Sequence, residues 1–423
     1  MKEDFLHFVW KHRKTGTSRM HTTSGLLLDV LEVGAHNKLA GPDFFNAKIR
    51  IDGQLWAGNV EVHLKSSDWY AHHHEQDENY DNVILHVVWE DDCSVFRKDN
   101  SEIPTLALKR YIPDTLLESY QKLFQVKRDT FINCGRDITL VNPIVVENWL
   151  ERMFFERLER KTTTIFKLLQ QRKNNWEAVL YALLLKNFGS KINGEAFYAL
   201  AMSLDFSIVR KSDRFQLEAL LLGMAHLLEG DFVSEPYYGQ LKTEFDYLYK
   251  KFGLNNTAVP KPAFFKLRPA NFPTIRLSQF AHMYGEWPNL FQKVVNSTDM
   301  SDLEAIFSAV ANSYWDTHYT FGKVSAKRKK KLSKKFIALL TINTVIPLKF
   351  CYAKHRGIDA NVVILKMMRS LKGEENSILT GFRQLGLSVD NAQDGQALLQ
   401  LYHQYCVPKK CMQCAIGNQL IRH

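Results

Sequence analysis

The feature that most constrains the fold is a pair of alternating segments, NAKIRI and QLWAGNVEVHLK, joined by Asp52-Gly53. Asp-Gly between two such segments is a strong signal for a tight β-hairpin. Successive side chains of a strand point to opposite faces of the sheet. Glu61, His63 and Lys65 therefore emerge together on one face, while the valines and the leucine beside them enter the core. The hairpin predicts a sheet with one polar face that carries useful chemical groups.

The residues around the hairpin predict a compact α/β domain over residues 1–115. NVILHVVWED carries few charges and is expected to form a central strand, and residues 94–113 are expected to add one or two more strands. Near the N-terminus, Phe5, Phe8 and Val9 recur at helical spacing. GLLLDVLEVG is expected to add another apolar helical turn or two.

From about residue 114 the chain is expected to be helical almost throughout. Its segments show apolar residues at helical spacing and consist of good helix formers, and Asn142-Pro143 marks a helix start. Residues 255–276 hold four of the twelve prolines and are expected to form an extended connector. The helical domain therefore divides into a first part (116–254), the connector (255–276), and a second part with a cysteine-containing tail (277–423).

Composition limits the class of protein and its partners. A chain of 423 residues with a net charge of +10 favours a polyanionic partner, because lysine and arginine release counterions from phosphate. No signal peptide or membrane span is expected, so we predict a cytoplasmic protein. Six cysteines are too few for a disulfide scaffold, and Cys93, Cys134 and Cys351 are most simply buried or free thiols.

Two acids near the hairpin suit a metal site. Asp43, in GPDF, and Glu61 lie eighteen residues apart and are expected to meet on adjacent strands. Mg²⁺ or Mn²⁺ binds a few carboxylates together with water and substrate oxygens, and it activates water for attack on a phosphodiester. Lys65 or His63 would orient that water. Glu32 is a candidate for an additional carboxylate.

Histidines follow directly after the Glu61 strand. His72, His73 and His74 stand in WYAHHH, close to Asp68, whereas His86 shares a strand face with apolar residues and is expected to be a core histidine. Imidazole and carboxylate at this density suit Zn²⁺ or Mn²⁺, or an acid–base role in which His72 or His74 assists the leaving group. The alternative for the triplet is a solvated loop.

The region from Gly41 to Trp89 resembles a PD-(D/E)XK nuclease core. The resemblance implies a restriction-endonuclease-like mixed sheet, a metal held by Asp43 and Glu61, and hydrolysis of DNA. The sequence departs from the usual pattern because His63 stands where that family has its lysine, and Lys65 comes two residues later. WYAHHH is similar in kind to the tryptophan and histidines of very short patch repair endonucleases. GPDF, W-G-x-VE-H, SDW and LHVVW also resemble an uncharacterised bacterial family with a helical remainder, which carries no established activity.

A basic run and a cysteine tail lie in the second half of the chain. KVSAKRKKKLSKK has eight Lys/Arg in thirteen residues and is either a solvated helix end or a phosphate-binding surface. The predicted nucleic-acid contacts in this run are Lys327, Arg328, Lys329, Lys330 and Lys331.

In the tail, Cys406-x4-Cys411-x2-Cys414 predicts zinc or an iron–sulfur cluster, with redox-active or plain thiols as the alternative. A fourth ligand is expected from His403, His423 or a distant cysteine such as Cys351.

The sequence thus predicts a metal-dependent nuclease acting on DNA, or on RNA. One alternative is a catalytically inactive nucleic-acid-binding or scaffold protein, in which the basic run and the cysteine tail make the contacts. A second is a zinc-dependent hydrolase of a small substrate that uses His72, His74 and Asp68.

Overall fold

The computed structural model describes residues 1–16, 19–37, 39–125, 130–232, 234–287 and 289–422. The chain forms two compact units. The first comprises residues 1–149, 384–386 and 401–423, and the second comprises residues 150–383 and 387–400. The first unit therefore includes both the predicted α/β domain and the cysteine tail. The domain boundaries predicted from the sequence assign that tail to the helical domain instead.

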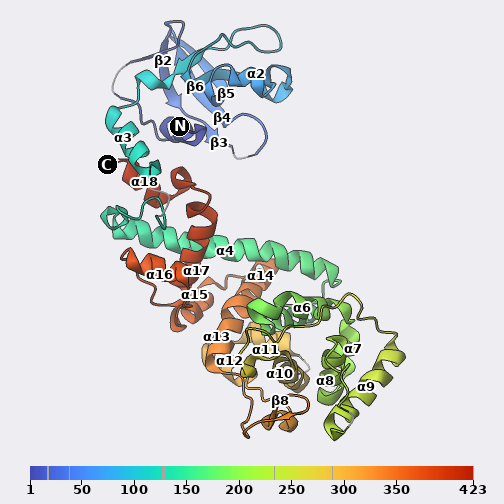
Figure 1. Cartoon of the computed structure of the whole chain (residues 1–423). Coiled ribbons are helices and arrows are strands. Elements are labelled where there is room, and N and C mark those ends of the chain that lie inside the picture. Colours follow the sequence, from blue (N-terminus) through green and yellow to red (C-terminus); the bar gives the residue numbers. More distant parts are fainter. Residues whose placement is uncertain (17–18, 38, 126–129, 233, 288, 423) are drawn as a thin grey trace. The chain divides into compact units, whose positions relative to one another are not determined.

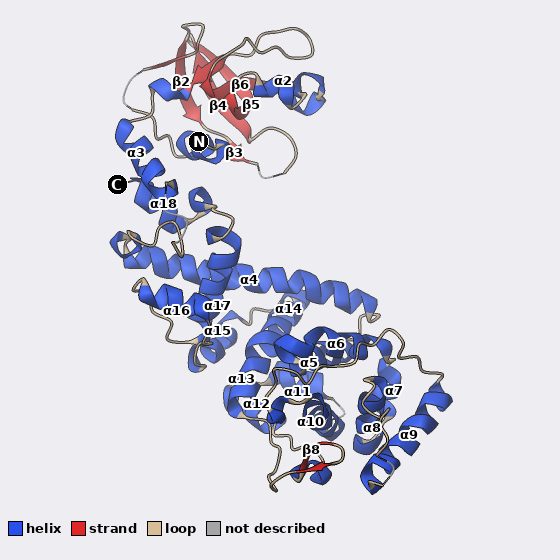
Figure 2. Ribbon diagram, viewed as in Figure 1, coloured by secondary structure: helices blue, strands red, loops and turns tan. Residues whose placement is uncertain are grey.

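A mixed β-sheet forms the centre of the first unit (Figures 1 and 2). Its strand order is β1-β2-β4-β5-β6-β7, and β3 pairs with β4. The β2/β4 and β4/β5 pairs are antiparallel, whereas β5/β6 and β6/β7 are parallel. The strands are β1 (Met20–His21), β2 (Leu27–Glu32), β3 (Ala35–His36), β4 (Phe44–Ile51), β5 (Gln54–Lys65), β6 (Val83–Glu90) and β7 (Thr105–Ala107). The predicted fold class, an α/β domain followed by mostly helical structure, is confirmed.

The predicted hairpin is present in the register that the alternation requires. Ile51 pairs with Gln54, and Asp52 and Gly53 between them have φ values of 47° and 87°. The helical turn expected in GLLLDVLEVG is wrong, because this segment forms β2 and Leu28 pairs with Ile51 of β4. Periodicity alone does not separate a strand from a helix in so short an apolar run.

Helices cover the sheet and bury its apolar side chains. Phe5 and Val9 of α1 (Glu3–Lys11) share a core with Val60 and Val62 of β5, and α3 (Asp114–Phe124) adds Tyr120. Each such side chain, once fully buried, stabilises the fold by roughly 1.5–3 kcal/mol. Since Glu61 and His63 alternate with these valines, they point away from this core.

A second hydrophobic cluster lies beside the polar face. It contains Trp69 of α2 (Asp68–Ala71) and Tyr80, and the ring of Trp69 contacts those of His74 and His86. Two short 3₁₀ helices, η1 (His74–Gln76) and η2 (Glu78–Tyr80), complete the connection from β5 to β6. The segment between these two parallel strands therefore places the histidine triplet next to Glu61 and His63.

In the described residues of the second unit, the regular structure is helical apart from a small hairpin, β8 (His318–Thr320) and β9 (Lys323–Val324). The expected helix start is confirmed, since α4 begins at Pro143. The later helices are α4 (Pro143–Gln171), which crosses the unit boundary, α5 (Trp176–Phe188), α6 (Ser190–Ser203), α7 (Phe206–Lys211), α8 (Arg214–Met224), α9 (Pro236–Phe252), α10 (Pro273–Glu286), α11 (Leu290–Asn296), α12 (Met300–Ile306), α13 (Lys334–Leu340), α14 (Ile346–Arg356), α15 (Asn361–Ser370), α16 (Ser377–Gln384) and α17 (Ala392–Leu401), with α18 (Ala415–Arg422) in the first unit.

One helical stretch is long and apolar enough to be compared with a membrane span. Lys334–Arg356 has 23 residues, and 72% of its most apolar window is buried within the protein. It is interrupted by a π-helical turn, η7 (Thr341–Val345). This stretch therefore has the burial of a core helix.

Candidate functional site

Asp43 and Glu61 lie together at the start of β4 and in the middle of β5. The backbone N–H of Asp43 donates to Glu61 Oε2 at 3.1 Å, and the backbone N–H of Val62 donates to Asp43 Oδ2 at 3.1 Å. The antiparallel pairing of Phe44 with Val60 brings the two acids to adjacent strands, as the sequence predicted. Each carboxylate thus has one oxygen held by the backbone and a second oxygen beside it.

Histidines surround the free oxygen of Glu61. Glu61 Oε1 is 3.5 Å from His63 Nε2 and 3.4 Å from His74 Nε2, and His63 Nε2 is 3.1 Å from His72 Nδ1. On its other side, His63 Nδ1 is 2.9 Å from His86 Nε2. His86 is fully buried, as expected of a core histidine, and it fixes the ring of His63 so that Nε2 faces the carboxylate.

Burial sets the protonation of this group. Burial raises the pKa of Glu61, although its contact with His74 opposes the shift. Burial and the charges of the neighbouring histidines lower the pKa of His63 to about 2, and burial lowers the pKa of His86 to about 3. Both imidazoles are therefore neutral near pH 7, which is the form that binds a metal.

The three histidines are arranged as metal ligands would be. The ligand atoms of His63, His72 and His74 all lie within 4.8 Å of one another, and this is the one such group of His, Cys, Asp and Glu side chains among the described residues. Glu61 is within 3.5 Å of two of them. Three imidazoles and one carboxylate suit Zn²⁺ or Mn²⁺ better than Mg²⁺, which prefers oxygen ligands.

Helix α1 contributes two groups that the sequence reasoning missed. His7 Nε2 is 3.1 Å from Asp43 Oδ2. Burial lowers the pKa of His7, but its ion-pair contact with Asp43 and the nearby acids raise that pKa more. Burial raises the pKa of Glu3; the charge of His7 lowers that pKa, and the charge of Asp43 raises it. The i, i+4 spacing of Glu3 and His7 is the sequence signal that would have placed them on one helix face.

Two predicted site residues lie elsewhere. Glu32 is exposed in β2, and its carboxylate pairs with Lys48 Nζ at 2.8 Å. Lys65 is exposed at the end of β5, and its positive charge contributes to the lowered pKa of Asp92. Neither side chain has a contact with Asp43 or Glu61 among those that the structure describes, so Glu32 is not the additional carboxylate and His63 holds the position of the expected lysine.

The three tail cysteines come together, and the fourth partner is Cys134. Cys134, Cys406, Cys411 and Cys414 line one cavity in the first unit. The suggested fourth ligands are not there: His403 is exposed, and the Cys351 thiol faces the Thr162 carbonyl in the second unit. His423 lies outside the described residues. The sequence had treated Cys134 as an isolated thiol, because 272 residues separate it from the tail.

The basic run of the second unit (323–335) is mostly exposed, and only its last two residues, Lys334 and Lys335, are helical. Lys327, Arg328, Lys329 and Lys331 are exposed. Lys330 is only 5% exposed; its Nζ donates to the Asp316 and Arg328 carbonyls and lies over the Tyr319 ring. The prediction that Lys330 contacts nucleic acid is therefore wrong, because this ammonium is used within the fold.

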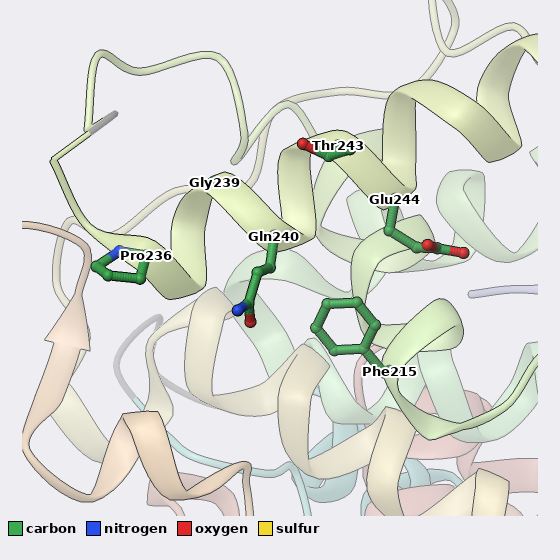
Figure 3. Close-up of a pocket in the computed structure, with 6 residues that line it drawn as sticks. All are labelled: Phe215, Pro236, Gly239, Gln240, Thr243 and Glu244. Atoms are coloured by element: carbon green, nitrogen blue, oxygen red, sulfur yellow. The ribbon is translucent and has the colours of Figure 1, made fainter.

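A separate open pocket of about 670 Å³ lies beside α9 in the second unit (Figure 3). Its lining residues are Phe215, Pro236, Gly239, Gln240, Thr243 and Glu244. The one carboxylate among them, Glu244, accepts a hydrogen bond from Gln216 at 3.0 Å. These residues include no histidine or cysteine, so the pocket offers no counterpart to the metal-binding groups of the first unit.

Comparison with known proteins gives a family but no activity. A family model described as a protein of unknown function (DUF2851) matches residues 3–377. No curated protein and no solved structure matches the chain.

Proposed function

The chain belongs to this DUF2851 family, and we propose that it is a metal-dependent nuclease that hydrolyses phosphodiesters in DNA. The single observation that carries the proposal is the position of Glu61. Its carboxylate lies between the Asp43 backbone on one side and the nitrogens of His63 and His74 on the other. A buried acid so surrounded is suited to hold a cation that activates water.

The order of elements supports a PD-(D/E)XK-like core. A helix, α1, is followed by three antiparallel strands (β2, β4 and β5), a crossover that contains α2, and the parallel strand β6. That arrangement resembles the core of these nucleases, with Asp43 before the second strand and Glu61 on the third. The further acid from the first helix would be Glu3, in place of Glu32.

The residues divide the chemistry between them. Glu61, His63 and His74 would hold the metal, with Asp43 beside them, and the metal would lower the pKa of a bound water and neutralise charge on the phosphate. His86 Nε2 contacts His63 Nδ1, the ring nitrogen of His63 that does not face Glu61, and so holds that ring as outer partners of metal-binding histidines do. His72 is exposed and can exchange protons with the leaving group. His7 orients Asp43.

The test is cleavage of linear, nicked and branched DNA with Mn²⁺, Mg²⁺ or Zn²⁺. Wild type is compared with Glu61→Gln, Asp43→Asn and the matched control Glu32→Gln. Loss of a direct ligand should cost at least about a hundredfold in rate, since loss of an outer partner alone typically costs 10–100-fold. Glu32→Gln should retain full activity, because that acid pairs with Lys48 on the surface.

The proposal fails if wild-type protein cleaves no substrate with any of these metals, or if Glu61→Gln cleaves as fast as Glu32→Gln. Binding to DNA without cleavage would instead favour an inactive nucleic-acid-binding protein. In that case the affinity should fall steeply with salt.

A second candidate, a zinc-dependent hydrolase of a small substrate, is favoured by one observation. The close group of His63, His72 and His74 is more typical of zinc than of a magnesium nuclease. The metal content of the isolated protein separates the two. Stoichiometric zinc that depends on His72 and His74, with hydrolysis of small esters but not of DNA, would replace the nuclease.

A further inference from the structure

Four of the six cysteines enclose one cavity in the first unit. Cys134, Cys406, Cys411 and Cys414 line a space of about 20 Å³, measured as the volume open to the centre of a water molecule. All four are free thiols in the structure. Because that measure leaves out one water radius at every wall, the space between the side chains is wider than this figure, and its lining is mostly sulfur and apolar carbon.

As bare thiols these side chains stay neutral. Burial and the neighbouring cysteines raise the pKa of Cys134 to about 12, and the same two causes raise the pKa of Cys411 to about 12 and that of Cys406 further. The dominant cause is desolvation, and the next is repulsion between the sulfurs themselves. A metal cation removes both penalties, because it binds thiolates directly.

Polar groups near the sulfur atoms oppose the effect of burial. The backbone N–H groups of Ile416 and Gly417, at the start of α18, lower the pKa of Cys414 against the effect of burial, and the Asn133 side chain does the same for Cys411. A Cβ at Gly417 would lie 2.3 Å from the Cys411 carbonyl oxygen, so the chain approaches this close only with glycine. Donors to sulfur are a feature of sites that hold negatively charged thiolates.

We infer that Cys134, Cys406, Cys411 and Cys414 hold an iron–sulfur cluster. The alternative, one tetrahedral zinc ion, needs sulfurs about 3.8 Å apart, given a Zn–S bond of about 2.3 Å. Among the described residues, three histidines have ligand atoms within 4.8 Å of one another, and no three of these cysteines do. The spacing of the sulfurs around the cavity is therefore wider than one zinc ion needs. In a four-iron cluster each thiolate binds a different iron, which suits that wider ring.

The cluster would join two distant parts of the chain within the first unit. Cys134 lies between α3 and α4 in the sequence, and the other three cysteines belong to η8 (Tyr402–Cys406), η9 (Cys411–Gln413) and the residue before α18. Its binding releases the proton of each thiol and ties the C-terminal segment to residues 131–134. This inference is independent of the nuclease proposal, because none of these cysteines contacts Asp43, Glu61 or the histidines among the described contacts.

The test is metal and sulfide analysis of the full chain, isolated without oxygen. Iron, acid-labile sulfide and zinc are measured together with visible absorption for wild type, Cys134→Ser, and the matched control Cys93→Ser, a thiol outside the cavity. We expect iron with sulfide in wild type and Cys93→Ser, and at least a tenfold loss of both in Cys134→Ser.

Wild-type protein that contains stoichiometric zinc without sulfide overturns the cluster, and so does protein that contains no metal even after reconstitution with iron and sulfide. Equal iron and sulfide in Cys134→Ser and wild type would overturn the assignment of Cys134. If Cys134→Ser does not fold, Cys406→Ser takes its place, because Cys406 is only partly buried. The wild-type analysis decides the presence of the cluster in any case.

Discussion

The first unit contains two groups of side chains suited to bind a metal, and they differ in almost every respect. The histidine–carboxylate group takes its proposed ligands from residues 43–74 and includes the exposed His72. The cysteine group combines residue 134 with residues 406–414 around an enclosed cavity. The first is open to solvent and made of neighbours in sequence, and the second is closed and made of distant parts.

The difference separates two uses of a metal. An active site needs a coordination position open to substrate, whereas a structural site surrounds its metal with protein ligands. The histidine–carboxylate group meets the first condition and the cysteine group meets the second. We therefore assign chemistry to Glu61 and its histidines and stability to the four cysteines, and the predictions below test that division.

The largest expected effect is on folding. Cys414→Ser should lower the free energy of unfolding of the first unit by about 3–5 kcal/mol, because a lost ligand releases a metal whose binding is part of folding. His72→Gln should change it by no more than about 1 kcal/mol, since that ring is exposed. Urea titration followed by hydrogen exchange at residues 401–422 measures both. Equal destabilisation by the two variants would remove the distinction between the sites.

A smaller effect is expected from pH. In protein stripped of metal at the histidines, the pKa of His63 is about 2 when folded and 6.5 when unfolded, so the unfolded chain binds the extra proton between these values. Stability is therefore fully present above pH 6.5 and falls as the pH drops below it, by up to about 1.4 kcal/mol per pH unit for each such histidine. His86, whose pKa is about 3, adds to the slope.

The check is thermal unfolding of the chelated protein between pH 4 and 8, with His63→Gln for comparison. The variant should show a shallower decline. In protein stripped of the cluster as well, the cysteine group should contribute no change in this window, because burial holds the thiol pKa values of Cys134 and Cys411 near 12. A decline as steep in His63→Gln as in wild type would show that the acid sensitivity has another source.

The smallest effect is expected at Lys65. Lys65→Ala should change the rate of DNA cleavage by less than about tenfold, because this side chain is exposed and its charge acts on Asp92. His63→Ala should reduce the rate far more, since it removes a proposed ligand. Cleavage assays at saturating Mn²⁺ measure both variants. A larger loss in Lys65→Ala than in His63→Ala would restore the lysine to the site.

Part of the candidate site could be predicted because its residues are local. Alternation along one strand placed Glu61 and His63 on one face, and the turn at Asp52-Gly53 fixed the register that brings Asp43 beside them. Glu32 was assigned wrongly for a related reason. Its segment has an apolar pattern that fits both helix and strand, and only pairing with β4 decided the matter.

The sequence by itself determined the mixed α/β start, the helical remainder, the hairpin and the acids on it, because these follow from periodicities of two and 3.6 residues and from turn chemistry. Tertiary structure alone decided that His7 of α1 faces Asp43, that Lys330 is buried, and that Cys134 joins the tail cysteines. Contacts between segments far apart in the chain leave no periodic signal, since they depend on how complete elements pack.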